Sequence, residues 1–229
     1  MKYLSTDYDE KLNTISHYIN YPEMRPWIGV NYKYEKVKIL IVGESHYLSK
    51  DSKYHLKAED WYNGISDSQK DKHINGINTR KVINRGITIK WKKKSYVIFK
   101  NIEDALFSSQ LFSNKPASVY YNIAFMNYFQ RPAQVPGKSI LLEKIDEEIA
   151  KKVFLQVVDC IKPTAIIFTS SLAYKSAKRN GALESLKSKN ISFARSPHPA
   201  TSWWNRKSKK YGNKTGKDHF ISFVNEQVK

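Results

Sequence analysis

The most constraining feature of the sequence is the alternation of short apolar runs with helical segments. The run "KILIV" at residues 38–42 ends at Gly43, and "TAIIFTS" at residues 164–170 is a second run of this kind. Between them a helix is expected over about residues 141–161, because Ile and Val recur every four residues from 145 to 161 and form one apolar stripe. Buried strands that are separated by helices pair in parallel, so the chain is expected to form an α/β sheet with helices on both faces.

The remaining segments extend this pattern. "SVYYNIAFM" at residues 118–126 and the start of "ISFARSPHPA" at residues 191–200 are strand candidates. Further helices are expected at residues 102–112, 171–181 and 217–228. The prediction is a three-layer α/β/α sandwich with a central, mainly parallel four-stranded sheet. Residues 1–229 are expected to form a single domain, with a polar, basic insertion at about residues 49–95.

The charge of the chain is strongly basic and unevenly distributed. Its 39 Lys and Arg residues against 21 Asp and Glu give a net charge of +18. Residues 185–217 contain nine basic side chains and no acid, and residues 80–100 contain eight and no acid. A compositional bias toward Lys is one explanation, but the segregation of the charges favours a surface that follows a polyanion such as DNA.

The composition also limits the compartment and the cofactors. Cys160 is the only cysteine, so neither an intramolecular disulfide nor a multi-cysteine metal site can form. We find no apolar run of about 18 residues and no signal-peptide pattern, so a cytoplasmic protein without a membrane partner is expected. The histidines lack the spacing of a metal site, and we expect no metal, no cofactor and a monomer.

Polar residues lie after or late in three of the predicted strands. "GESHY" at residues 43–47 and "SPH" at residues 196–198 follow their strands, and Asn122 lies late in the strand predicted at 118–126. Ligands of such sheets bind beyond the carboxyl ends of the strands, so the three clusters are expected to converge on one site.

A serine hydrolase is the first chemistry to consider. Gly-Glu-Ser after an early strand, with a late His, is loosely similar to GDSL esterases, but Arg195 stands where their Asp precedes the His. The second glycine of a G-x-S-x-G elbow is also missing after Ser45. This interpretation is therefore weak.

Hydrolysis of an N-glycosidic bond suits the residue types better. The reaction needs negative charge near an oxocarbenium-like sugar and a hydrogen-bond donor for the departing base, and Glu44 and His198 are of these types. A flipped nucleotide also needs a base-edge reader and an aromatic wall, for which Asn122 and Tyr47 are candidates. An apolar wedge for the vacated gap would be Trp203 and Trp204, although a tryptophan pair can equally cap a core.

At these residues the sequence resembles the uracil-DNA glycosylase superfamily. "GESHY" is similar to the family's first motif, and "VYYNIAFMNYFQRPA" to its strand with a base-reading Asn followed by Arg-Pro. "SPHPATSWW" resembles the third motif, a His-Pro-Ser sequence with a DNA-intercalating loop. The resemblance covers about residues 36–225 and depends on these three short motifs in order.

The resemblance implies a role for each matching residue. His198 would stabilise the leaving base, Asn122 would read the base edge, and Tyr47 would crowd position 5 of the pyrimidine. The family's water-activating Asp falls at Ser45 and its Pro at His46. The role of general base or electrostatic partner must therefore pass to Glu44, to Ser45 acting through water, or to an acidic residue outside the matched motifs. Gly43 and His46 complete the expected substrate wall. The expected DNA contacts are Ser196, Thr201, Ser202, Trp203, Trp204, Arg206, Lys207, Lys209 and Lys210.

The expected function is therefore a monofunctional DNA glycosylase that leaves abasic sites in double- or single-stranded DNA. Uracil is placed ahead of a modified pyrimidine as the excised base, in DNA repair or in anti-phage defence against modified DNA. The alternatives are a non-catalytic member of the fold that binds DNA or RNA and, more weakly, a GDSL-like esterase.

Overall fold

The protein is an α/β sandwich built on one five-stranded sheet. The computed structural model describes residues 3–65 and 72–229. The strands are β1 (Trp27–Ile28), β2 (Ile39–Gly43), β3 (Ala124–Asn127), β4 (Ala165–Phe168) and β5 (Ser192–Arg195), in the order β1-β3-β2-β4-β5. The strands β2 to β5 are parallel, which confirms the four predicted strands. The fifth, β1, was not predicted; it pairs antiparallel with β3 at the edge of the sheet.

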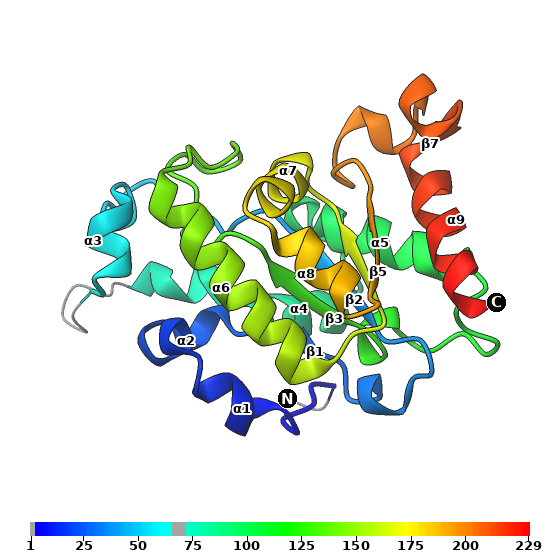
Figure 1. Cartoon of the computed structure of the whole chain (residues 1–229), viewed down its shortest axis with the longest axis horizontal. Coiled ribbons are helices and arrows are strands. Elements are labelled where there is room, and N and C mark those ends of the chain that lie inside the picture. Colours follow the sequence, from blue (N-terminus) through cyan, green and yellow to red (C-terminus); the bar gives the residue numbers. More distant parts are fainter. Residues whose placement is uncertain (1–2, 66–71) are drawn as a thin grey trace.

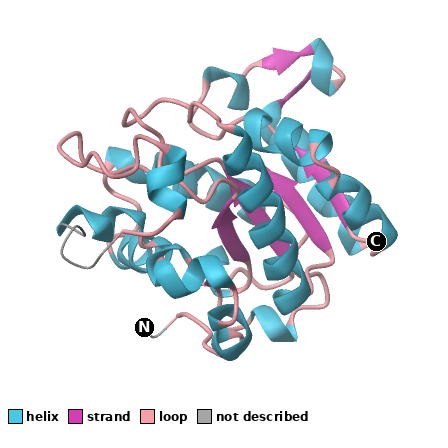
Figure 2. Cartoon of the chain, turned by 60° about the vertical axis from the view of Figure 1, so that its left-hand side comes forward, coloured by secondary structure: helices cyan, strands magenta, loops and turns pink. Residues whose placement is uncertain are grey.

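Helices cover both faces of the sheet (Figures 1 and 2). Alternate residues of β2 point to opposite sides, so Leu40 and Val42 join one hydrophobic core while Ile39 and Ile41 join the other. Helices α1 (Asp9–Asn13), α2 (Ser16–Asn20), α6 (Lys144–Ile161), α7 (Ser171–Arg179) and α8 (Ala182–Ser188) contribute to the first core. Helices α4 (Thr79–Thr88), α5 (Val97–Phe107) and α9 (Gly216–Val228) contribute to the second.

Two predicted elements have different boundaries in the structure. The helix expected at 102–112 is α5, which lies five residues earlier because a 3-10 turn, η4 (Lys94–Tyr96), leads directly into it. The strand expected at 118–126 begins as the 3-10 turn η5 (Val119–Tyr121), because the Ser118 hydroxyl accepts a hydrogen bond from the Tyr120 amide at 3.3 Å. Only the end of this segment is strand.

The region at about 49–95 packs into both cores. Its described elements are α3 (Ala58–Tyr62), η3 (Lys72–Ile77) and α4. Trp61 of α3 lies in the first core and Ile83 of α4 in the second. Part of the region, 66–71, lies outside the described residues, and the single-domain organisation stays a prediction.

The chain beyond β5 forms a projecting basic element. The short strands β6 (Lys207–Ser208) and β7 (Lys214–Thr215) pair antiparallel around η7 (Lys209–Tyr211), and Figure 1 shows β7 beyond the start of α9. We call residues 206–214 the basic hairpin. Within the described residues, no helix is both long and apolar enough to cross a membrane.

Candidate active site

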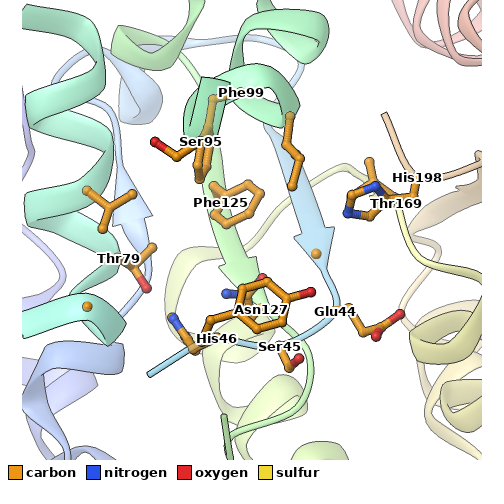
Figure 3. A pocket seen from close by; sticks show the side chains of 15 residues that line it. Glu44, Ser45, His46, Thr79, Ser95, Phe99, Phe125, Asn127, Thr169 and His198 are labelled. Atoms are coloured by element: carbon orange, nitrogen blue, oxygen red, sulfur yellow. The ribbon is translucent and has the colours of Figure 1, made fainter. Parts of the chain in front are cut away.

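A cavity of about 230 Å³ lies at the carboxyl ends of the parallel strands (Figure 3). β2 and the residues after it supply one wall, β3 supplies Phe125 and Asn127, and the loop after β5 supplies His198. Residues 76–82 of the inserted region and Phe99 of α5 complete the lining. The expected convergence of the first and third polar clusters is therefore found at this edge.

Gly43 leaves room for the Asn127 side chain at the cavity. A Cβ atom at this position would lie 2.4 Å from Oδ1 of Asn127, so any other residue would displace that amide. The register places Gly43 opposite Asn127. The glycine that ends the apolar run thus makes room for an amide beside it.

Asn122 does not lie in this site, and its predicted role in reading the base is wrong. It precedes β3, at the opposite end of the sheet, and its Nδ2 donates to Oε1 of Glu35 at 2.5 Å. Asn127, five residues later at the carboxyl end of β3, lines the cavity instead. Asn127 could have been found from the sequence by the pattern that identified "GESHY". In both places a polar residue comes directly at the end of a buried apolar strand.

Glu44 and His198 lie on the same side of the cavity (Figure 3). The Glu44 carboxylate accepts a hydrogen bond from the Ser170 hydroxyl at 2.6 Å, which orients it. Nδ1 of His198 accepts a hydrogen bond from the Ala200 amide at 3.3 Å. A neutral His198 therefore carries its proton on Nε2, where it can be donated to a ligand.

The ionisation of His198 reflects its position. Burial lowers the pKa of the imidazole below its usual value, and the nearby Glu44 carboxylate opposes this shift. The backbone around the imidazole is held in place, because the amide and hydroxyl of Thr201 both donate to the His198 carbonyl, at 2.9 and 2.8 Å. The side chain is thus a preorganised, neutral donor.

Ser45 and His46 are buried beside the cavity. Ser45 Oγ has no hydrogen-bond partner among the described residues, so no histidine activates it and a serine-esterase arrangement is missing in that part of the chain. Burial lowers the pKa of His46 to about 3, and its imidazole is neutral at physiological pH.

Aromatic rings line the side of the cavity formed by β3 and α5. Phe99 and Phe125 are inclined to one another with ring centroids 5.2 Å apart. A planar base can stack against such rings. Neither ring was predicted from the sequence to be at the site, because both belong to ordinary apolar patterns of a helix and a strand. Tyr47, which was predicted, lies at the mouth with 38% of its surface exposed.

The Trp203–Trp204 pair divides between two roles. Trp203 is 54% exposed, whereas Trp204 is buried. The Trp204 ring packs edge-on against Phe220 of α9, with ring centroids 5.6 Å apart. The prediction that Trp204 contacts DNA is therefore wrong, and this ring caps the core. The prediction that Ser196 contacts DNA is also wrong. This residue is fully buried, and its amide donates a hydrogen bond to the Phe168 carbonyl at 2.9 Å.

The other expected DNA-contacting side chains are exposed. They are Thr201, Ser202, Arg206, Lys207, Lys209 and Lys210. A second hollow of about 510 Å³, which we call the groove, shares Glu44, Tyr47 and His198 with the cavity. Lys138, Lys175 and Trp203 also line it. The cavity thus opens beside a groove with cationic side chains.

Within residues 3–65 and 72–229, no group of three or more His, Cys, Asp and Glu side chains is placed to hold a metal ion. No protein-family model matches the sequence, and no curated protein matches it significantly.

Proposed function

We propose that the protein is a monofunctional DNA glycosylase that hydrolyses the N-glycosidic bond of a pyrimidine nucleotide flipped into the cavity. The observation that carries the proposal is the convergence of Glu44, His198 and Asn127 on one cavity with aromatic rings. An engineered cavity of about 150 Å³ holds a benzene ring, so about 230 Å³ has room for a pyrimidine.

Each group has a place in the reaction. The bond between C1′ of the sugar and N1 of the base breaks, and its electron pair leaves with the base. Nε2–H of His198 donates a hydrogen bond to the base oxygen on which the charge develops. Water adds its oxygen to C1′, and Glu44, oriented by Ser170, stabilises the cationic sugar and accepts the proton of the water.

The nucleophile of this proposal is water. Among the described residues, no lysine lines the cavity, so a covalent step through a lysine amine has no support there. The product is therefore an abasic site with an intact DNA backbone.

DNA is the proposed polymer because of the charges beside the cavity. Lys138 and Lys175 line the groove, and the basic hairpin carries exposed lysines beyond it. Trp203, exposed at the edge of the groove, is the wedge that would fill the gap left by the flipped nucleotide.

The direct test is cleavage of DNA at enzymatically produced abasic sites. Oligonucleotides with one uracil, and phage DNA with modified cytosines, are incubated with the protein and then treated with alkali. We expect strand breaks that disappear in His198→Ala and Glu44→Ala but persist in Glu184→Ala, a matched change at an exposed position of α8. Salt-sensitive DNA binding without breaks in any substrate would identify a non-catalytic DNA-binding protein instead.

A further inference from the structure

The loop that carries His198 is held in place near both of its ends. We call residues 196–204 the histidine loop. Where the loop leaves the sheet, the Ser196 amide donates a hydrogen bond to the last carbonyl of β4 at 2.9 Å. The first turn of α9 packs against the loop so closely that a Cβ atom on Gly216 would overlap the Pro197 ring. These contacts fix where the loop lies, but they do not set the direction of the peptide groups within it.

The middle of the histidine loop is held by a side chain of α5. Nδ2 of Asn101 donates a hydrogen bond to the Pro199 carbonyl at 2.8 Å, across 98 positions of the chain. A carbonyl oxygen can only accept, so the nitrogen of the Asn101 amide must face it. Pro199 is buried, and Asn101 therefore supplies a donor to a carbonyl that burial separates from water.

The same peptide group also contacts the imidazole. The Pro199 carbonyl and the Ala200 N–H belong to one planar, trans peptide unit, so they point in opposite directions. Asn101 holds the oxygen, and the N–H donates to Nδ1 of His198 at 3.3 Å. A carbonyl that accepts a hydrogen bond also makes the N–H of its peptide a better donor. A continuous chain of hydrogen bonds thus runs from Asn101 through this peptide to His198.

This chain bears on which nitrogen of His198 carries the proton. Because Nδ1 accepts from the Ala200 amide, the proton of the neutral imidazole lies on Nε2. Stabilising a departing base requires a donor that is already aimed at it. An imidazole in the other tautomer would present a lone pair to the base, and it would oppose the developing charge.

Asn101 belongs to the helix that also carries one of the aromatic rings. Phe99 lies two residues earlier in α5, and Figure 3 shows Phe99 and His198 both at the cavity. A single helix therefore positions a ring that can stack on the base and, through Asn101, the peptide that orients the donor.

We propose that Asn101 is a positioning residue for His198, which it holds, through the Pro199–Ala200 peptide, as an Nε2–H donor directed into the cavity. The catalytic consequence depends on the proposed glycosylase function. The tautomer of His198 is a property of the protein without DNA, so it can be tested separately.

The first measurement needs no substrate. Nitrogen-15 NMR of protein labelled in its histidine rings shows which nitrogen of each neutral imidazole carries the proton, and His198→Gln identifies the His198 signals. We expect the Nε2–H form in wild type. In Asn101→Ala the share of the Nδ1–H form should rise about fivefold, as the loss of one net hydrogen bond implies. Asn101→Asp should have at least this effect, because it keeps the side-chain shape but replaces the donor by a carboxylate.

The second measurement is single-turnover excision from the uracil oligonucleotide or the modified phage DNA, whichever wild type cleaves. Both Asn101 variants should excise the base about threefold to tenfold more slowly at saturating protein, again because one hydrogen bond is lost. Their affinity for the DNA should not change, because Asn101 lies outside the linings of the cavity and the groove. A slower reaction at unchanged affinity distinguishes positioning from DNA binding.

Asn225→Ala is the matched control. Asn225 of α9 is half-buried, as Asn101 is, and its Oδ1 accepts a hydrogen bond from the Gln110 amide at 2.7 Å. The substitution thus removes a bond between distant segments that does not involve the histidine loop. We expect Asn225→Ala to lose stability in urea as Asn101→Ala does, but to keep the wild-type tautomer and excision rate.

The outcomes separate this proposal from the proposed function. A His198 that keeps the Nε2–H form in both Asn101 variants overturns the positioning role, whether or not the protein excises a base. An excision rate that is unchanged in both variants overturns it as well. A shifted tautomer in a protein whose wild type excises no base overturns the glycosylase proposal and leaves the link between Asn101 and His198 standing.

Discussion

Two asparagines show how much the position of a single residue decides. Asn122 and Asn127 belong to the same segment, but they lie before and at the end of β3, a four-residue strand. Asn122 pairs with Glu35, whereas Asn127 faces the cavity. A shift of five residues along the chain thus moves an amide from one end of the sheet to the other.

Matched alanine substitutions test this assignment. Asn127→Ala removes the amide expected to pair with the base edge, and we expect kcat/KM for base excision to fall by about 10-fold to 100-fold. Asn122→Ala should leave kcat/KM unchanged, because its side chain lies outside the cavity. Equal losses in the two variants would contradict the assignment.

His46 should make the stability of the protein depend on pH. Its pKa is about 3 in the folded state because of burial, against about 6.5 for an ordinary histidine. Between these values the unfolded chain binds a proton that the folded chain does not bind. The stabilisation is therefore complete above pH 6.5 and is lost as the pH falls toward 3.

The expected contribution of His46 is a slope of about 1.4 kcal/mol in the free energy of unfolding for each pH unit. His46→Gln removes this titration, so its free energy of unfolding should fall less steeply than that of wild type between about pH 6 and 4. Urea unfolding at a series of pH values measures both slopes. Parallel curves would show that His46 does not titrate in this range.

The site residues predicted from the sequence are those that interrupt an apolar pattern. The residues that were missed belong to a regular helix or strand pattern, or to a region without one. Glu44 and His198 follow apolar strands, so they were conspicuous. Phe99, Phe125 and Thr79 belong to regular helix and strand patterns, or to a region without strong periodicity. Their role at the cavity depends on which way each element faces.

At the scale of elements, a fully buried ion pair joins the segment after β3 to α6. Arg131 and Asp146 have no exposed side-chain surface, and their nitrogen and oxygen atoms are 2.6 and 2.8 Å apart. Arg131 Nη1 also donates to the carbonyls of His55 and Leu56, both at 3.1 Å. Arg131, in the Arg-Pro sequence after β3, therefore anchors the backbone at His55 and Leu56. This backbone belongs to the inserted region, which also contributes to the lining of the cavity.

Removing one partner of this pair should be costly. Asp146→Asn leaves the buried Arg131 guanidinium with only the half-exposed Glu143 carboxylate, 3.4 Å away, as a counter-charge, so we expect a loss of about 3 kcal/mol in the free energy of unfolding. Asp159→Asn, in the same helix, breaks only surface contacts with Lys162 and Lys189 and should cost less than about 1 kcal/mol. Urea unfolding at neutral pH compares the two variants. Similar losses would show that the pair does not contribute as a buried ion pair.

Across the whole molecule, basic side chains extend from the groove to the hairpin beyond it. Lys138 and Lys175 line the groove, and the exposed Arg206, Lys207, Lys209 and Lys210 lie in the basic hairpin. Each phosphate contact releases counterions and adds about 0.9 to the slope of log affinity against log salt concentration. The hairpin should therefore account for much of the salt dependence of DNA binding.

Replacing these four hairpin residues by Gln should reduce that slope by about 2 to 4. The matched control replaces Lys36, Lys38, Lys162 and Lys189, which precede strands and lie at the opposite end of the sheet. This control removes the same charge and should keep the wild-type slope. Fluorescence anisotropy with a labelled duplex at several salt concentrations measures both, and equal reductions would indicate a net-charge effect without a defined DNA surface.

The sequence by itself determined the parallel α/β architecture, the existence of helices α5, α6, α7 and α9, and the edge of the sheet at which polar residues gather. These follow from local periodicity, because a buried strand and an amphipathic helix impose their patterns on neighbouring residues. Tertiary structure decided which asparagine reaches the cavity, which tryptophan is buried and which helix brings Thr79 to the site. Those outcomes depend on strand register and on packing between residues far apart in the chain, and local patterns contain neither.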